Sequence, residues 1–218
     1  MSARENILAR IRKAHGRQGA EPTAAELAAV HATIARHEIG PQPSMARTAD
    51  PVAHFRAECD RLGTTHDEVA AFDQVPAAVA RYLESKGLEK RAVIWHELAT
   101  LDWAAHQIAI DDRPANGDDR TGITGCFCAI AETATLLLLS SPREPKATAL
   151  LPETHICIVR KSRLVDTMEQ AFATLRSERG ELPRATFFVS GPSRTADIEQ
   201  TIVIGAHGPY RVHVVLVP

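Results

Sequence analysis

Apolar residues recur at intervals of three and four positions near the start of the chain, which is the spacing of one face of an α-helix. Ser2 and Glu5 have the spacing of a capping box, in which each side chain binds a free N–H group of the first helical turn. This pattern predicts a first helix that ends at Gly16. Residues 22–37 repeat the apolar spacing in an alanine-rich background and predict a second helix.

Residues 40–51 interrupt this pattern, because they hold three prolines and few apolar side chains. Such a segment is typical of a linker between structural units. We therefore expect an N-terminal helical arm over residues 1–40, which packs on a partner or on a second copy of the chain. Residues 51–218 are expected to form a separate α/β domain.

Beyond residue 51, short apolar runs alternate with helical patterns. Helices are predicted at 51–62, at 74–86 and at 165–179, the first two with a glycine directly after them. Strands are predicted at 91–95, 106–110, 135–140, 155–160, 186–190 and 212–217. Strands that alternate with helices form mostly parallel sheets, because the connecting helices cover the two faces. The predicted fold class is therefore α/β, with a mostly parallel sheet and helices on both faces.

The composition excludes some classes of protein. Hydrophobic residues make up 44% and charged residues 24% of the chain, as in ordinary globular domains. The 25 Lys and Arg residues nearly balance the 27 Asp and Glu residues, so we expect neither nucleic acid nor a membrane surface as a partner. The N-terminus lacks the apolar core of a signal peptide, and no apolar run approaches the ~20 residues of a membrane span. These features predict a cytoplasmic protein without a membrane span.

The four cysteines form no recognisable metal motif. Cys126 and Cys128 are separated by one residue, but no second pair completes the four thiolates of an iron–sulfur cluster. The histidines are scattered and lack the spacing of zinc ligands. We therefore predict no metal and no cofactor in this chain, and we expect the two cysteines to be small buried or site-adjacent thiols.

Glu132 is the first candidate for chemistry. Together with Thr133 it stands just ahead of a predicted buried strand, after a stretch rich in glycine and threonine. A carboxylate in this place can act as a nucleophile, as a general base or as an acceptor for a ligand that Thr133 also contacts. The alternative interpretation is that Glu132 caps a short helix or pairs with an arginine.

A second candidate segment, residues 190–199, combines a glycine-proline turn and several hydroxyls with an acidic run that predicts the start of a helix. The free N–H groups of a helix N-terminus bind anions, so the segment predicts a phosphate or carboxylate site. The residues assigned to this site are Gly191, Ser193, Arg194, Thr195 and Asp197. Alternatively, the acidic residues only complement the helix dipole.

The third candidate segment, residues 202–217, predicts a strand, a tight loop and another strand. Gly205 and Gly208 allow close backbone approach and flank His207, which is placed as an acid–base or ligand-contacting residue. Arg211 follows as a further anion-binding candidate. Alternatively, the segment is a hairpin whose histidine only faces solvent.

These segments carry a family resemblance. The runs GITGCFCAIAETATLLL, LPETHICIV and GPSRTADIEQTIVIGAHGPYRVHVVLV resemble the LUD domain family, in the short form known as lactate-utilization protein C. The resemblance covers most of the chain and is strongest after residue 120. The family pattern beside Glu132 often reads AETGT, whereas this chain has Ala134 in place of the glycine.

The resemblance implies a fold similar to that of ribose-phosphate isomerases, CoA-transferases and folate cyclo-ligases. It also implies a place in a three-protein system that oxidises L-lactate to pyruvate, in which the iron–sulfur clusters belong to the partner proteins. This chain would then be a non-redox subunit that docks its partners and holds a small anionic ligand.

A second hypothesis is a free-standing isomerase-like or transferase-like enzyme, or a regulator on the same fold, which binds a phosphate-bearing small molecule. In the enzyme, Glu132 would be the base or the nucleophile. A deep pocket that joins Glu132, Thr195 and His207 would favour this second hypothesis, whereas a shallow surface with an apolar docking face would favour the subunit.

Overall fold

The computed structural model describes residues 2–16, 20–38, 40–41, 50–180, 182–197 and 199–218. Internal contacts divide the chain into two compact units, Met1–Met45 and Ala46–Pro218. Within the described ranges, every helix is too short or too polar to cross a membrane.

The N-terminal unit contains two capped helices, α1 (Ala3–Ala14) and α2 (Ala24–Arg36). The capping box at Ser2 is confirmed, and Thr23 forms a second one with Glu26. Neither helix buries any residue. Each keeps an exposed apolar stripe, formed by Ile7, Leu8 and Ile11 on α1 and by Leu27, Val30 and Ile34 on α2.

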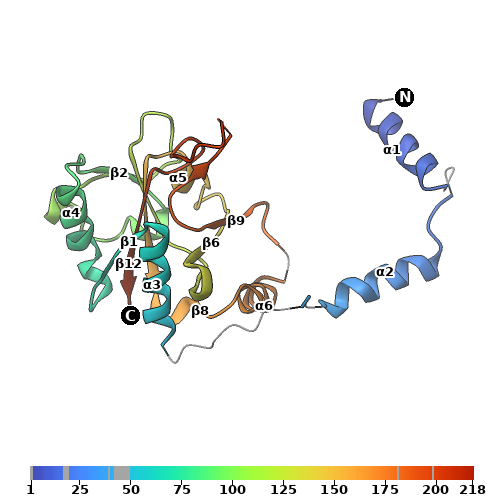
Figure 1. Cartoon of the computed structure of the whole chain (residues 1–218), viewed down its shortest axis with the longest axis horizontal. Helices are drawn as coiled ribbons and strands as arrows, with labels where there is room; N and C mark the ends of the chain where they lie inside the picture. The colour runs from blue at the N-terminus through green and yellow to red at the C-terminus, as the bar shows by residue number, and fades with distance from the viewer. Residues whose placement is uncertain (1, 17–19, 39, 42–49, 181, 198) are drawn as a thin grey trace. The chain divides into compact units, whose positions relative to one another are not determined.

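The larger unit is built around a six-stranded sheet with the order β1-β12-β7-β4-β2-β3, in which every pair is parallel. Figure 1 labels β1, β2 and β12 of this sheet. The strands are β1 (Thr65–Glu68), β2 (Arg91–Ile94), β3 (Ala109–Asp111), β4 (Thr121–Thr124), β7 (Thr154–Arg160) and β12 (Arg211–Val217). The α/β fold class with a mostly parallel sheet is thus confirmed.

Alternate side chains of the central strands enter two different cores. Ile156 and Ile158 of β7 pack with helix α4 (Val75–Ser85), whereas Cys157 and Val159 point the other way, toward α3 (Pro51–Leu62). This alternation follows from the two-residue side-chain period of a strand, and it requires a sheet that is apolar on both faces.

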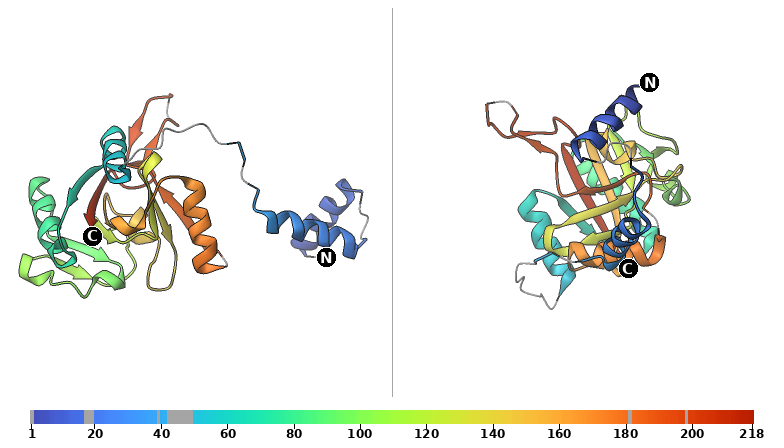
Figure 2. Two further views of the ribbon diagram at one scale, coloured as in Figure 1. Left: turned by 90° about the horizontal axis from the view of Figure 1, so that it is seen from below. Right: turned by 90° about the vertical axis from the view of Figure 1, so that its right-hand side faces the viewer.

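A second sheet packs on the same face of the main sheet as α3. Its order is β8-β5-β6-β9, and its strands are β8 (Leu164–Val165), β5 (Cys128–Ile130), β6 (Thr135–Leu139) and β9 (Thr186–Val189). Its outer face packs on α6 (Met168–Arg179), and Figure 2 shows α4 and α6 on opposite sides of the two sheets. The strands predicted at 135–140 and 186–190 therefore exist, but they pair antiparallel in this sheet. The single turn η4 (Ala131–Thr133) between β5 and β6 is too short for a parallel crossover.

Most predicted elements are confirmed with shifts of a few residues at their ends. Helix α6 begins three residues later than predicted, because Thr167 caps it, and the strand predicted at 106–110 is β3, preceded by the turn η3 (Ala104–His106). Strands β1, β4, β5, β8 and β10 (Arg194–Thr195) were not predicted. The remaining short elements are η1 (Phe72–Gln74), η2 (His96–Leu98), α5 (Ala147–Leu150) and η5 (Lys161–Arg163).

The helix predicted to start after Thr195 is wrong. Residues Arg194–Thr195 form strand β10, which pairs antiparallel with β11 (Val203–Ile204), so the segment is a hairpin that projects from the body of the unit (Figure 2). The acidic residues between the two strands lie in the connecting turn, where their polarity suits solvent exposure.

Candidate functional site

Glu132 caps a helix. It is half-buried in η4, and its Oε1 accepts a hydrogen bond of 2.9 Å from the N–H of Met168, the first residue of α6. Its own N–H donates to the carbonyl of Asp166 at 3.1 Å. A carboxylate at a helix N-terminus satisfies a free donor and complements the dipole, so the structure favours the capping interpretation of this residue.

Thr133 belongs to a chain of hydroxyls that links the first two candidate segments. Its Oγ1 lies 2.7 Å from Oγ1 of Thr135, which lies 2.6 Å from Oγ of Ser190. The next residue, Gly191, has φ of +77°, and a Cβ there would lie 3.1 Å from Cβ of Leu62. This cluster ties β6 and β9 to the end of α3.

Ala134 adopts φ of +43°, in the left-handed region. Only glycine adopts this region without a steric penalty, which explains the glycine in the family pattern AETGT.

The hairpin brings residues of the second and third segments together. Nε2 of His207 lies 3.3 Å from Oδ2 of Asp197, and the Thr195 hydroxyl and His207 lower the pKa of Asp197. The two side chains of this pair are 69% and 72% exposed, so water weakens their attraction. Arg194 donates to the carbonyl of Leu62 at 2.5 Å and fastens the hairpin to α3.

The loop after the hairpin packs tightly at the amino-terminal edge of the sheet. A Cβ at Gly208 would lie 3.3 Å from Cβ of Ser193, and Gly205 has φ of +83°. Arg211 donates to the Thr154 hydroxyl at 3.5 Å. No described contact joins Glu132 to His207 or to Thr195, so the pocket that would unite these three residues is not seen in the described part of the chain.

A cavity lies at the opposite, carboxyl-terminal edge of the parallel sheet. The chain leaves β2 toward β3 on one side and leaves β4 toward β7 on the other, so the strand order reverses between β2 and β4. Open α/β sheets bind ligands outside the carboxyl ends of their strands at such a reversal. The residues that follow β2 (Trp95, Glu97 and Leu98) and β4 (Gly125, Cys126 and Phe127) line this cavity.

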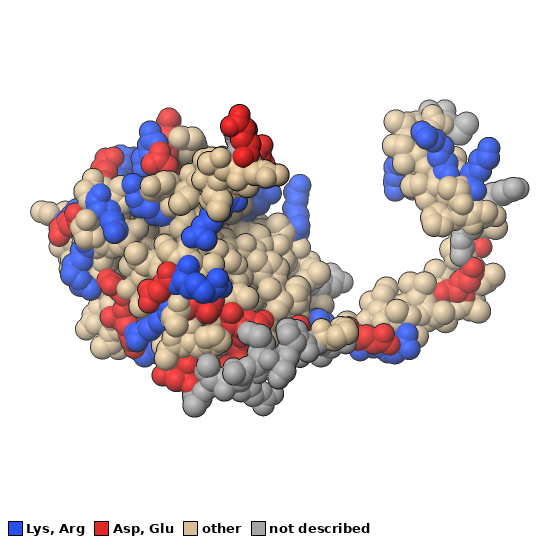
Figure 3. Space-filling model, in the orientation of Figure 1, with Lys and Arg blue, Asp and Glu red and all other residues tan. Residues whose placement is uncertain are grey.

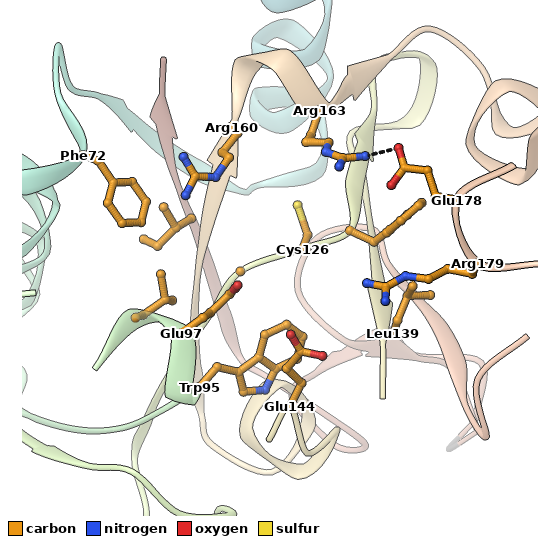
Figure 4. Close-up of a pocket in the computed structure, with 14 residues that line it drawn as sticks. Phe72, Trp95, Glu97, Cys126, Leu139, Glu144, Arg160, Arg163, Glu178 and Arg179 are labelled. Atoms are coloured by element: carbon orange, nitrogen blue, oxygen red, sulfur yellow. Dashed lines mark hydrogen bonds and ion pairs between the residues drawn. The ribbon is translucent and has the colours of Figure 1, made fainter. Parts of the chain in front are cut away.

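The cavity has a volume of about 300 Å³ and mixes charged with apolar groups (Figure 4). This volume lies at the lower end of the range for small-molecule sites. The apolar and aromatic lining residues are Phe72, Trp95, Leu98, Phe127, Leu139 and Ile158.

Figure 3 shows basic and acidic side chains interspersed over the displayed face of the larger unit.

Three arginines supply the positive charge of the cavity. Arg163 donates to Glu178 at 2.6 Å, whereas Arg160 and Arg179 form no ion pair with any described carboxylate. The Arg160 guanidinium lies 4.5 Å from the centre of the Phe72 ring, within the range of an attractive cation–π contact. Arginine presents a planar fork of donors that matches a carboxylate or a phosphate. Arg160 and Arg179 can therefore hold an anion.

Two glutamates face these arginines. The Glu97 carboxylate lies in the middle of the cavity with Glu144 nearby, as Figure 4 shows. Burial of the carboxylate and the charge of Glu144 raise the pKa of Glu97, and Arg160 opposes the shift. A carboxyl with a raised pKa can donate a proton or a hydrogen bond near neutral pH.

The thiols of Cys126 and Cys128 are neutral in the folded protein. Cys126 lines the cavity, and Cys128 is fully buried, as expected of a small buried thiol. A hydrogen bond with Cys157 and burial raise the pKa of Cys126 well above its usual value, so its thiol stays neutral. Among the described residues, no group of three or more His, Cys, Asp or Glu side chains could hold a metal ion.

None of the residues predicted to form the site lines this cavity. Glu97, Arg160 and Arg179 were missed, because charged residues in separate loops give no motif. One signal was available: Glu97 follows closely after the strand predicted at 91–95, where ligands of parallel sheets bind.

Comparison with known proteins places most of the chain in one family. The model of the LUD domain matches residues 53–217. Lactate utilization protein C of Exiguobacterium is 43% identical over 99 residues, which are 44% of this chain and 43% of that protein. The protein of the same name in Bacillus licheniformis is 33% identical over 127 residues, 56% of this chain and 53% of that protein.

Two further proteins are similar to this chain. An uncharacterized protein of Neisseria meningitidis, NMB1437, is 41% identical over 88 residues, 40% of this chain and 38% of that protein. The aligned segments of these relatives thus span from under two fifths to about half of their length. The crystal structure of a DUF162 family protein from Deinococcus radiodurans superposes with a TM-score of 0.57 and 23% identity, covering 80% of this chain and all of that one. This likeness shows the fold.

Proposed function

Because the chain belongs to the LUD domain family, as the sequence predicted, we propose that it takes part in lactate utilization. In this proposal it is a non-redox subunit of a system that oxidises L-lactate to pyruvate, and its partners are iron–sulfur proteins. The names of relatives that share 33 to 43% of their aligned residues with this chain support the process. The iron–sulfur partners are expected from the resemblance.

The cavity between β2 and β4, where the strand order reverses, is the observation that supports a ligand site in this chain. It combines two arginines that lack a described ion-pair partner with apolar walls, and this combination suits the anion of a small organic acid. We therefore place the small anionic ligand of the subunit in this cavity and not at the hairpin.

The alternative of a free-standing enzyme with Glu132 as base or nucleophile has less support. One oxygen of the Glu132 carboxylate accepts from the first N–H of α6, and the surrounding hydroxyls bond to one another. A nucleophile or base must lie within reach of a substrate, and Glu132 does not line the cavity that holds the arginines.

Growth on L-lactate tests the proposal. Deletion of the gene in its own host is expected to abolish growth on L-lactate and to leave growth on pyruvate unchanged, and the wild-type gene is expected to restore it. Arg160→Ala should fail to restore growth, whereas Arg120→Ala should succeed, because Arg120 pairs with Glu153 at the other edge of the sheet. Normal growth of the deletion strain on L-lactate would refute the proposed process.

Affinity purification tests the partners. The tagged chain is expected to retain proteins that contain iron and acid-labile sulfide when cells are grown on L-lactate. Size-exclusion chromatography with light scattering would show in the same samples whether a second copy of the chain is present. Recovery of the chain without any iron–sulfur protein would contradict the subunit role.

A further inference from the structure

A glycine leaves room for the Glu97 carboxyl. A Cβ at Gly125 would lie 2.3 Å from Oε1 of Glu97, so a side chain there would displace the carboxyl from its place beside the end of β4. Gly125 and Glu97 lie on the two connections that diverge at the strand reversal. The carboxyl therefore occupies the point where ligands of parallel sheets bind.

A second carboxyl is held in the same cavity. Trp95 at the end of β2 donates from its indole Nε1 to the carbonyl of Pro145 at 3.2 Å, which positions the loop that carries Glu144. Two neighbouring carboxylates in a partly desolvated space repel each other, so one of them tends to retain its proton. Glu97 is the one whose pKa is raised, first by burial and then by Glu144.

The other charged and titratable groups around Glu97 come from four elements. Arg160 is the last residue of β7, and Cys126, with a neutral thiol, follows β4. Arg163 belongs to η5 and pairs with Glu178 of α6. Arg179 is the last residue of α6. In Figure 4 Arg160 and Arg179 enter the cavity from different sides, and the Glu97 carboxylate lies below Arg160. A ligand that bridges the cavity would therefore meet cations and a carboxyl at once.

We propose, building on the role in lactate utilization, that this cavity binds 2-hydroxy and 2-oxo monocarboxylates and that Glu97 determines this specificity. The ligand carboxylate binds Arg160, the arginine whose charge acts on Glu97. The neighbouring hydroxyl or keto oxygen accepts a hydrogen bond from the Glu97 carboxyl. The hydrocarbon end of the ligand contacts Leu98 and Ile158. A simple carboxylate such as acetate would make the first contact and miss the second.

The size of the cavity agrees with this class and extends it. A volume of about 300 Å³ would hold about ten water molecules, which exceeds the needs of lactate or pyruvate alone. Homologous acids with longer hydrocarbon chains therefore fit the same contacts, and the remaining space holds ordered water around the smaller acids.

Calorimetric titration of the full chain with pyruvate, L-lactate and acetate tests the proposal. The wild-type protein is expected to bind pyruvate and L-lactate more tightly than acetate. Glu97→Gln keeps a hydrogen-bond donor and should keep this preference, whereas Glu97→Ala should lose about five- to tenfold of it, the usual loss for one hydrogen bond. Arg160→Ala should weaken all three ligands, and Arg120→Ala at the far edge should weaken none.

The pH dependence of ligand affinity distinguishes a direct role of Glu97 in binding from a purely structural role. An ionised Glu97 repels the ligand, so wild-type affinity should fall as pH rises through the raised pKa of Glu97. Glu97→Gln should make affinity independent of pH. Glu144→Gln should move the midpoint to lower pH without reducing affinity at the acid end, because it removes one cause of the raised pKa.

Two results would overturn the inference. Equal preference for pyruvate over acetate in Glu97→Gln and Glu97→Ala, with all variants unfolding at the wild-type temperature, would exclude the hydrogen bond from Glu97. Absence of binding of all three acids by the wild-type chain would exclude the ligand class, even where growth on L-lactate still requires the gene and the proposed function therefore stands.

Discussion

Two buried histidines are the most unusual single residues of the larger unit. His155 on β7 is fully buried, and its Nε2 lies 2.8 Å from the Thr124 hydroxyl. His213 on β12 is 2% exposed, stacks on Tyr82 with ring centres 3.9 Å apart and lies 2.9 Å from the Thr65 hydroxyl. Burial lowers the pKa of each histidine to about 4. Both imidazoles are therefore neutral in the folded protein at physiological pH.

These histidines predict acid sensitivity. Histidine in the unfolded chain titrates near pH 6.5, so the unfolded state takes up protons that the folded state refuses between about pH 6.5 and 4. The free energy of unfolding is expected to be highest above this window and to fall as pH decreases, by on the order of 3 kcal/mol per histidine. Urea unfolding at a series of pH values measures this fall. His213→Gln should make the dependence shallower, and an unchanged slope would show that His213 does not contribute.

Glu132 predicts a difference between two substitutions. Glu132→Gln keeps an oxygen that can accept from the N–H of Met168, whereas Glu132→Ala leaves this donor at the start of α6 without the acceptor. Glu132→Ala is expected to lower the free energy of unfolding by about 1 kcal/mol, and Glu132→Gln by less. Urea unfolding of the two variants provides the comparison. Equal effects would contradict the capping role.

At the scale of elements, the packing of α5 on β4 leaves no space at Gly122. A Cβ there would lie 1.9 Å from the carbonyl oxygen of Thr148 in α5. Gly122→Ala is therefore expected to destabilise the protein by about 3 kcal/mol, the upper end for overpacking, because backbone must move. Gly117→Ala is the matched control, since nothing lies within 4 Å of a Cβ there. Thermal unfolding of both variants should separate them, and equal midpoints would refute the close packing.

The sequence predicts best those elements whose buried residues form one uninterrupted apolar pattern. Strands β7 and β12 are apolar runs between the two cores, and α4 carries a clear apolar face. Strand β1 has the polar sequence THDE at the edge of the sheet, so it has no such pattern. The acidic run after Thr195 resembles a helix start, but pairing with β11 decides its conformation.

The candidate site was harder to predict, since its residues meet only through the sheet order. Glu97 and Arg160 are far apart in the chain and come together because β2, β4 and β7 are neighbours. Strand β4 was missed in the sequence, and without it the reversal beside β2 could not be located. The predicted segments are glycine-rich and specific to the family, and the structure uses Gly191 and Gly208 for close packing.

At the scale of the whole molecule, the division into two units predicts independent stability. Neither α1 nor α2 buries a residue, and the buried core clusters lie in the unit Ala46–Pro218. Removal of residues 1–45 is expected to change the free energy of unfolding of the remainder by less than about 0.5 kcal/mol. Thermal unfolding followed by circular dichroism measures this change.

The isolated segment 1–45 is the complementary test. Helices of 12 and 13 residues are marginal in water without packing, so the peptide is expected to show low helicity. A large fall in the stability of the truncated chain would show that the arm contributes to the folding of the larger unit.

The indole of Trp95 gives the protein an optical reporter. Trp95 and Trp103 are both buried, with 3% and 2% of their surface exposed. Of the two, Trp95 lines the cavity and is tied to the loop that carries Glu144, whereas Trp103 donates at 2.9 Å to the carbonyl of Leu98 in the core. The chain has two tryptophans, so its intrinsic fluorescence combines emission from Trp95, which a ligand in the cavity would change, with emission from Trp103, which it would not. A ligand that displaces water beside Trp95 should shift the emission maximum, and Trp95→Phe should remove the shift. Occupancy of the cavity can thus be followed by spectroscopy without any label.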